Sequence, residues 1–526
     1  MIRHLMIAGL VLGTISMAAA QPIPLQVKTD SGLVGGIDQD GMQAWLGIPY
    51  AAAPVGKLRW MPPQRPQPWS AVRDAKSFGN YCPQNEDLGV FGKPGGREDC
   101  LNLNVYVGKD AVRRGKKLPV FVWIHGGSLF VGANRDYDAS KLAKDGNAVV
   151  VTINYRLGLL GYFAHPVLNG EGHAFANYGF MDQQMALDWV QRNIAAFGGD
   201  KGNVTIAGES SGGNSVLAHV AAPGSRGNFQ HAIAMSGGAV ALKFPAFGAP
   251  KPLDFAEKMG TGFARAAGCE SGDAAACLRA LPVATVLAMQ TPYLINQVII
   301  DGTVMPMHPA EAYRSGKFNH VTLINGSTRD EGGFFAGAVE NLTQAPLQGA
   351  SYDKAMSDWF GTWAEEVKKA YPVSDYTNAS EAYAAAVTDM EFACPGRAIS
   401  RWVAAQTPTH AFEFADRTAP DYLTAPTSFV MGAGHSMELA YIFPGFHGGR
   451  GKPVKLNPLQ EKLSDTMVRY WTSAAGMKDR AAEWPRYDPS LDNYMSLVLP
   501  NPAMTKGSFG RIHKCEFWQR SGVIFD

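Results

Sequence analysis

The sequence predicts an α/β fold, in which helices cover both faces of a mostly parallel central sheet and large insertions separate some of the elements. Apolar, β-branched runs alternate with amphipathic helical segments in the first half of the chain, a pattern typical of parallel strands joined by helices. In addition, one such run leads through a glycine-rich turn directly into a helical segment. Strand, tight turn and helix in immediate succession favour the same class of fold.

The elements before this turn are two strands and a helix. Residues 117–125 (KLPVFVWIH) and 148–155 (AVVVTINY) are continuous apolar runs with many β-branched side chains, which predicts buried strands. Residues 181–194 carry their apolar side chains on a broad stripe at helical spacing, which predicts a helix.

The turn itself contains a candidate nucleophile, Ser210. A strand at 203–207 runs into GESSGG and then into a helix at 214–220. The G-x-S-x-G pattern between a strand and a helix is the context of a nucleophile elbow, whose sharp turn leaves no room for a Cβ on either side of the serine.

The second half contains two more predicted strands, at 321–325 and 410–415. The segment between them, with helical patterns at 356–367 and 380–387, looks like an insertion. Because no repeat, low-complexity tract or linker is evident, we expect residues 21–526 to form one elaborated domain.

A serine nucleophile needs a base and an acid. When the serine lies on a nucleophile elbow, both follow it in the chain. Histidines after residue 325 occur at His410, His435, His447 and His513. His435 is favoured because its loop, GAGHSME, is rich in glycine and follows a strand, while His447 on a similar loop is the rival. We interpret His410, in an alternating strand, and His513, beside a cysteine, as packed structural residues.

The acid is expected just after the strand at 321–325, where Asp330 and Glu331 are adjacent. Either carboxylate could instead favour the start of a following helix through its dipole, and local chemistry does not choose between the two. Backbone donors for an oxyanion are expected from the loop WIHGGS at 123–128 and from the N–H of Ser211, after the nucleophile.

The sequence also indicates where the protein is located and which partners and cofactors it lacks. Residues 1–20 have the basic start, apolar run and small-residue cleavage site of a signal peptide, so the mature chain is expected to begin at Gln21. No later segment predicts a membrane span. With a formal net charge of +1 and no basic block, nothing favours nucleic acid or an anionic membrane as a partner. The spacing of Cys and His lacks metal-site motifs, so neither a metal nor an organic cofactor is expected.

The six cysteines form an even set, which favours disulfides in an exported protein. They permit 15 pairings. Proximity along the chain suggests Cys82 with Cys100 and Cys269 with Cys277, which leaves Cys394 with Cys515.

At this point the sequence resembles the type-B carboxylesterase and cholinesterase family of α/β-hydrolases over nearly the whole mature chain. Residues 197–212 (FGGDKGNVTIAGESSG) look like the family's long serine signature, and residues 98–105 (EDCLNLNV) are similar to its second signature. Asn102 differs from the aromatic residue or threonine that is usual there.

The resemblance implies roles for individual residues. The implied triad is Ser210, Glu331 and His435, and the implied oxyanion hole consists of Gly127, Ser128 and Ser211. Ser128 and Ser211 depart from the family's usual glycine and alanine, but backbone donors tolerate small side chains, so we expect the hole to survive. The resemblance also implies supporting roles for Glu209, Ser236 and Glu438, buried pairs Arg59 with Glu98 and Arg156 with Asp182, and the three disulfides suggested above.

The sequence therefore predicts a secreted or periplasmic serine ester hydrolase, with an oligomeric state left open. The loop between Cys82 and Cys100 contains no tryptophan, and Phe91 is its only aromatic residue, which disfavours a cholinesterase-like site for quaternary ammonium. An esterase for polyester natural products of the fumonisin type is an alternative, with Lys93 and Arg97 as weak candidates for binding its carboxylates. A non-catalytic binding protein is the alternative from another class. We favour esters with short or medium acyl groups and uncharged alcohols.

Overall fold

The computed structural model describes residues 23–85, 90–109, 111, 117–422, 426–474 and 481–525. The expected signal peptide, residues 1–20, and the expected first mature residue, Gln21, lie outside this range.

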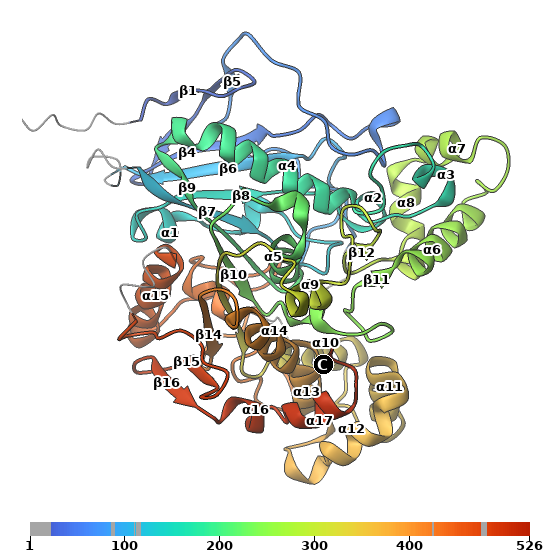
Figure 1. The fold of residues 1–526 in the computed structure, drawn as a ribbon, viewed down its shortest axis with the longest axis vertical. Coiled ribbons are helices and arrows are strands. Elements are labelled where there is room, and N and C mark those ends of the chain that lie inside the picture. The colour runs from blue at the N-terminus through green and yellow to red at the C-terminus, as the bar shows by residue number, and fades with distance from the viewer. Residues whose placement is uncertain are drawn as a thin grey trace, which may run out of the picture.

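A large central sheet organises the described chain, with helices on both sides of it (Figure 1). Its 11 strands are β3 (Ile37–Gln39), β4 (Met42–Pro49), β6 (Asn102–Gly108), β7 (Leu118–Ile124), β8 (Val149–Ile153), β9 (Gly199–Glu209), β10 (His231–Met235), β13 (Thr322–Thr328), β14 (Thr409–Phe414), β15 (Asn493–Leu497) and β16 (Ala503–Lys506). Their spatial order is β16-β15-β14-β13-β10-β9-β7-β8-β6-β4-β3.

The strands from β8 to β15 in this order are all parallel, and those at the two edges are antiparallel. The prediction of a mostly parallel sheet covered by helices is therefore confirmed. Two smaller sheets lie apart from it, one of β1 (Gln26–Lys28), β2 (Leu33–Gly35) and β5 (Arg73–Asp74), the other of β11 (Lys251–Pro252) and β12 (Ile299–Ile300).

The helices vary widely in length. They are α1 (Ser140–Lys144), α2 (Gly158–Gly161), α3 (Pro166–Asn169), α4 (Tyr178–Asn193), α5 (Ser211–Ala221), α6 (Leu253–Ala266), α7 (Ala274–Ala280), α8 (Val283–Met289), α9 (Pro309–Ser315), α10 (Gly332–Thr343), α11 (Gly349–Phe360), α12 (Ala364–Ala370), α13 (Ala379–Val387), α14 (Cys394–Ala404), α15 (Pro458–Trp471), α16 (Phe509–Ile512) and α17 (Cys515–Arg520). Figure 1 shows α6, α7 and α8 together on one side of the sheet and α11 and α12 at the lower end of the molecule.

The predicted strands correspond to β7, β8, β9, β13 and β14, and the first predicted helix corresponds to α4. Several predicted boundaries were wrong. The strand predicted at 203–207 extends over Gly199–Glu209, and the one predicted at 321–325 extends over Thr322–Thr328. The helix after the turn begins at Ser211 rather than at 214, and the helical segment at 356–367 is split into α11 and α12 at Gly361, whose φ is +55°. Among the strands that were not predicted is β10, which lies between β9 and β13 in the sheet.

Covalent and ionic links tie the outer segments to the core. Disulfide bonds join Cys82 to Cys100, Cys269 to Cys277 and Cys394 to Cys515, the pairs that proximity suggested. The nearly buried pairs Arg59–Glu98 and Arg156–Asp182 each have a 2.7 Å contact. Among the described residues, no helix is both long and apolar enough to cross a membrane.

The strand order brings distant chain segments to one edge of the sheet. Strands β7, β9, β10, β13 and β14 are consecutive neighbours and parallel, so their carboxyl ends lie along the same edge. The loops that leave these ends contain the predicted oxyanion loop, Ser210, Ser236, the Asp330–Glu331 pair and His435. Such an edge is where open α/β sheets place their binding sites.

Candidate active site

The turn after β9 holds Ser210 in a strained conformation. Its φ is +58° and its ψ is −127°, a region that a residue with a side chain seldom occupies. A Cβ at Gly208 would lie 2.5 Å from the backbone of Gly212, and one at Gly212 would lie 2.1 Å from the carbonyl oxygen of Ile124. The glycines are therefore required by close packing, which leaves the Ser210 side chain partly exposed at the top of the turn.

The predicted acid and base are in contact. Nδ1 of His435 lies 2.5 Å from Oε2 of Glu331. The other oxygen of Glu331 accepts hydrogen bonds from Oγ of Ser236 at 2.5 Å and from the backbone N–H of Thr328 at 2.7 Å. These contacts fix the carboxylate and orient the imidazole through its Nδ1, as a catalytic base requires.

The rival residues have other partners. Asp330 accepts hydrogen bonds from the backbone of Ala433 at 2.8 Å and from Nε of Arg417 at 3.0 Å. Nδ1 of His447 lies 3.0 Å from the carbonyl oxygen of Gly445. His513 is held between two carboxylates, and His410 packs against the ring of Trp484.

The second imidazole nitrogen of His435 faces another carboxylate. Its Nε2 lies 3.2 Å from Oε1 of Glu209, which also accepts a hydrogen bond from Oγ of Ser436 at 2.5 Å. Within the described residues, no hydrogen bond joins the Ser210 hydroxyl to His435, although the two side chains line one cavity.

Several buried carboxylates determine the charge of this imidazole. Burial alone lowers the pKa of His435, but Glu209, Glu331 and Glu391 raise it to about 9. Burial raises the pKa of Glu209 to about 7 and that of Glu391 to about 8. Glu438 is also buried, with no partner for either carboxyl oxygen among the described residues, and burial raises its pKa well above the usual range.

The loop after β7 presents backbone donors beside the serine. Gly127 and Ser128 have φ values of +104° and +51°, and the carbonyl of Gly127 accepts hydrogen bonds from residues 130 and 131. In the described part of the chain, the N–H groups of Gly127, Ser128 and Ser211 have no acceptor. The hydroxyl of Ser211 accepts a hydrogen bond from the Leu129 N–H at 3.2 Å, so this departure from alanine adds a link between the two loops.

These groups surround a small aromatic cavity with an empty volume of about 380 Å³. It is lined by Phe91, Gly126, Gly127, Ser128, Tyr137, Glu209, Ser210, Phe334, Phe335, His435 and Ser436. The disulfide-closed loop therefore contributes Phe91 to the cavity. Aromatic walls around Ser210, and three N–H groups without an acceptor among the described residues, suit an uncharged acyl group whose carbonyl oxygen becomes negative during reaction.

Sequence reasoning missed Glu391 and the aromatic residues behind the imidazole. The rings of Phe335 and Phe392 lie 5.2 and 5.0 Å from that of His435. Glu391 lies in a short π-helical segment, residues 388–393, where no local pattern distinguishes a buried carboxylate from an exposed one. No cluster of potential metal ligands occurs among the described residues.

Comparisons with known proteins identify the family of this chain. Residues 24–518 match the model of the carboxylesterase family. The chain belongs to the carboxylesterase family. It is 34% identical to an acylcarnitine hydrolase of Mus musculus over 509 residues, covering 91% of this chain and 87% of the relative.

Other relatives of this carboxylesterase are also hydrolases. It is 34% identical to a para-nitrobenzyl esterase of Bacillus subtilis (strain 168) over 475 residues, covering 88% of this chain and 92% of that protein. A solved structure of a thermophilic PNB esterase superimposes with a TM-score of 0.77 at 30% identity, covering 93% of this chain and 99% of the other. The carboxylesterase is thus a carboxylic ester hydrolase with the α/β-hydrolase fold.

Proposed function

We propose that this carboxylesterase hydrolyses esters through an acyl-enzyme on Ser210. The hydroxyl oxygen attacks the ester carbonyl while His435 takes its proton, and the histidine then returns the proton to the leaving alcohol. Water, deprotonated by His435, releases the acid and regenerates the serine. The contact of His435 with Glu331, together with the cavity that His435 shares with Ser210, is the observation that supports this mechanism most directly.

The surrounding groups stabilise the charges that develop. The N–H groups of Gly127, Ser128 and Ser211 bind the oxyanion of the tetrahedral intermediate, since they have no other acceptor among the described residues. Glu331 stabilises the imidazolium, and Ser236 holds Glu331 in place. Glu209 adds negative charge beside the imidazole when it is ionised, whereas burial keeps the nearby Glu438 protonated.

The proposed substrates are uncharged esters with short or medium acyl groups. The cavity is compact and its aromatic lining contains no tryptophan among the described residues. Relatives named acylcarnitine hydrolase and para-nitrobenzyl esterase act on different esters, so family membership alone does not select the alcohol. We further propose that residues 21–526 are exported as one domain, which is supported by the apolar start of the chain and by its disulfides.

Kinetics on the purified mature protein test the proposal. Across a panel of uncharged esters with varied acyl and alcohol parts, Ser210→Ala is expected to lower kcat by roughly 10⁴ to 10⁶. Within the panel, a neutral butyrate ester is expected to give a higher kcat/KM than butyrylcholine. Near-native turnover by a folded Ser210→Ala protein would refute the acyl-enzyme mechanism, and a clear preference for butyrylcholine would refute the substrate class.

A further inference from the structure

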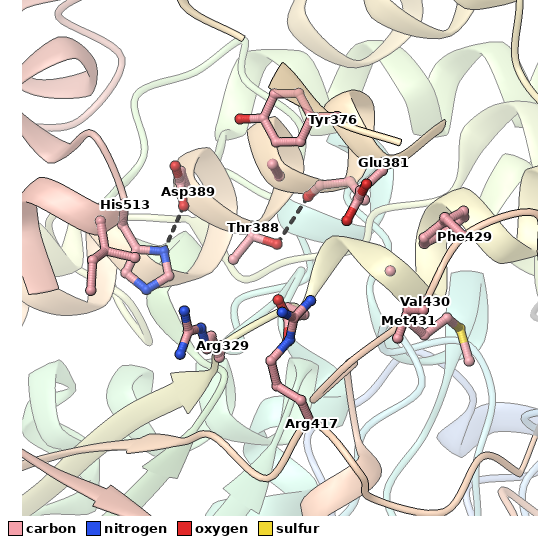
Figure 2. Close-up of a pocket in the computed structure, with 15 residues that line it drawn as sticks. Arg329, Tyr376, Glu381, Thr388, Asp389, Arg417, Phe429, Val430, Met431 and His513 are labelled. Atoms are coloured by element: carbon pink, nitrogen blue, oxygen red, sulfur yellow. Dashed lines mark hydrogen bonds and ion pairs between the residues drawn. The ribbon is translucent and has the colours of Figure 1, made fainter. Parts of the chain in front are cut away.

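A second cavity lies behind the turn that carries the proposed catalytic acid. It has an empty volume of about 760 Å³, compared with about 380 Å³ for the active-site cavity. Its walls come from the end of β13, from α13 and the segment that follows it, and from the loop that leads to His435 (Figure 2). None of its lining residues belongs to the active-site cavity.

Two arginines supply unused hydrogen-bond donors to this cavity. Figure 2 shows Arg329 and Arg417 extending from the same wall toward the open space. Arg329 is half-buried, and among the described residues its guanidinium has no hydrogen bond or ion pair. Arg417 contacts Asp330 through Nε at 3.0 Å, which leaves its terminal nitrogens available. Both arginines line this cavity, and Arg417 contacts Asp330, which follows Arg329 in the chain.

The carboxylates of the cavity are already engaged by other groups. Asp330 accepts hydrogen bonds from Ala433 and Arg417. Asp389 lies 2.6 Å from Nδ1 of His513 and accepts a hydrogen bond from the Tyr371 hydroxyl at 2.6 Å. Glu381, on the opposite wall in Figure 2, accepts a hydrogen bond from the backbone of residue 377. Among the described residues, the guanidinium N–H groups of Arg329 are therefore left without an acceptor.

The remaining wall is apolar and reaches the surface. Phe429, Val430 and Met431 lie on one side of the cavity, away from Arg329 (Figure 2). Val430 is 71% exposed and Ile512 is 48% exposed, which is unusual for two apolar side chains at one pocket. A ligand that binds here gains both from an anionic group at the arginines and from an apolar part at this wall.

We propose that this cavity is a binding site for an amphipathic carboxylate, separate from the active site. The carboxylate accepts paired hydrogen bonds from Arg329, supplemented by the free nitrogens of Arg417, because a planar guanidinium matches the two carboxylate oxygens. The alkyl part covers Phe429 and Val430. The ligand class is thus a monocarboxylic acid with a medium-length apolar chain.

Octanoate binding to the full mature protein tests this site. The reporter is the methyl NMR signal of Met431, which lines the cavity and is assigned with a Met431→Leu variant. Octanoate is expected to shift this signal saturably, and Arg329→Gln is expected to weaken the apparent affinity about tenfold or more, since a charge-assisted hydrogen bond is lost. Arg314→Gln, which removes an exposed arginine on α9 outside the cavity, is the matched control and should bind as the parent does.

Two further ligands separate the contributions of charge and chain. Octanol lacks the carboxylate, and inorganic phosphate lacks the apolar chain, so both are expected to bind much more weakly than octanoate. Ester hydrolysis by Arg329→Gln should remain near the parent level, which verifies that the variant is folded. The proposal fails if octanoate leaves the Met431 signal unchanged, if Arg329→Gln binds as tightly as the parent, or if octanol or phosphate matches octanoate.

Discussion

The imidazole of His435 is surrounded by more carboxyl groups than a triad needs. Glu331 and Glu209 contact its two nitrogens, and Glu391 is close enough to raise its pKa. If all of them were ionised, the histidine would stay protonated and could not act as a base. The raised pKa values of Glu209 and Glu391, caused by burial, limit this effect near neutral pH because part of each group keeps its proton.

Paired substitutions separate the proposed triad from its rivals. We expect Glu331→Gln and His435→Ala each to lower kcat by about 10³-fold or more, because the contact at Nδ1 orients the base. Asp330→Asn and His447→Ala, whose side chains contact neither His435 nor Ser210, should retain most of the turnover. Steady-state kinetics on variants with native circular dichroism make the comparison, and the opposite ranking would overturn the assignment.

The pH dependence of kcat/KM tests the role of Glu391. Activity requires neutral His435, so the rate should rise with pH, with a midpoint above the ordinary histidine pKa of 6.5. Glu391→Gln removes a carboxylate that stabilises the imidazolium, and the midpoint is therefore expected to move to lower pH. Glu270→Gln, an exposed carboxylate paired with Arg265, is the control. An unchanged midpoint in Glu391→Gln would show that this carboxyl group does not act on the base.

The disulfides join helical segments at very different separations along the chain. Cys394 begins α14 and Cys515 begins α17, so their bond joins segments 121 residues apart. Cys269 lies just after α6 and Cys277 lies within α7, so their bond joins positions only 8 residues apart. The two bonds therefore restrict the unfolded chain to very different extents.

Removing either bond should lower the free energy of unfolding, and the loss should be larger for the bond that closes the longer loop. The chain-entropy relation gives a loss of about 5 kcal/mol for Cys394→Ala with Cys515→Ala, and about 2.5 kcal/mol for Cys269→Ala with Cys277→Ala. Guanidinium denaturation of the two double variants measures this difference. An equal or larger loss for the shorter loop would contradict it.

Across the whole molecule, buried titratable groups make the free energy of unfolding depend on pH in two opposite ways. Burial lowers the pKa of His125, His219, His231, His308 and His410 to between about 3 and about 4, so protonation of these groups favours unfolding as pH falls below 6.5. In contrast, carboxylates raise the pKa of His435 to about 9 and that of His513 to about 10 against the effect of burial. Their contribution is complete below pH 6.5 and is lost as pH rises through these values.

The midpoint temperature of thermal unfolding is therefore expected to be highest near pH 6.5 and to fall between pH 6.5 and 8. Glu391, whose raised pKa makes the folded state bind more protons, adds to the fall, so Glu391→Gln should show a shallower decline than the parent. Thermal unfolding at a series of pH values checks this. A midpoint that rises steadily from pH 6.5 to 8 would be inconsistent with these pKa shifts.

The sequence alone was enough to predict the features that depend on residues close together in the chain. The elbow at Ser210 is recognisable because strand, glycines and helix are contiguous, and the short disulfides because their cysteines are close in the chain. Alternating strands and helices likewise predicted the parallel sheet, since each unit packs locally before the sheet is complete.

The tertiary structure decided what depends on the strand order. Local chemistry left Asp330 and Glu331 equivalent, and only the family resemblance separated them. In the folded protein, Glu331 meets His435, 104 residues further along the chain, while Asp330 turns toward Ala433. The burial of Glu391 and the cavity beside Arg329 have no local signal either, because both arise where segments from different strands and helices pack together. Burial and neighbouring charge set the chemistry of these groups, and only the folded chain defines them.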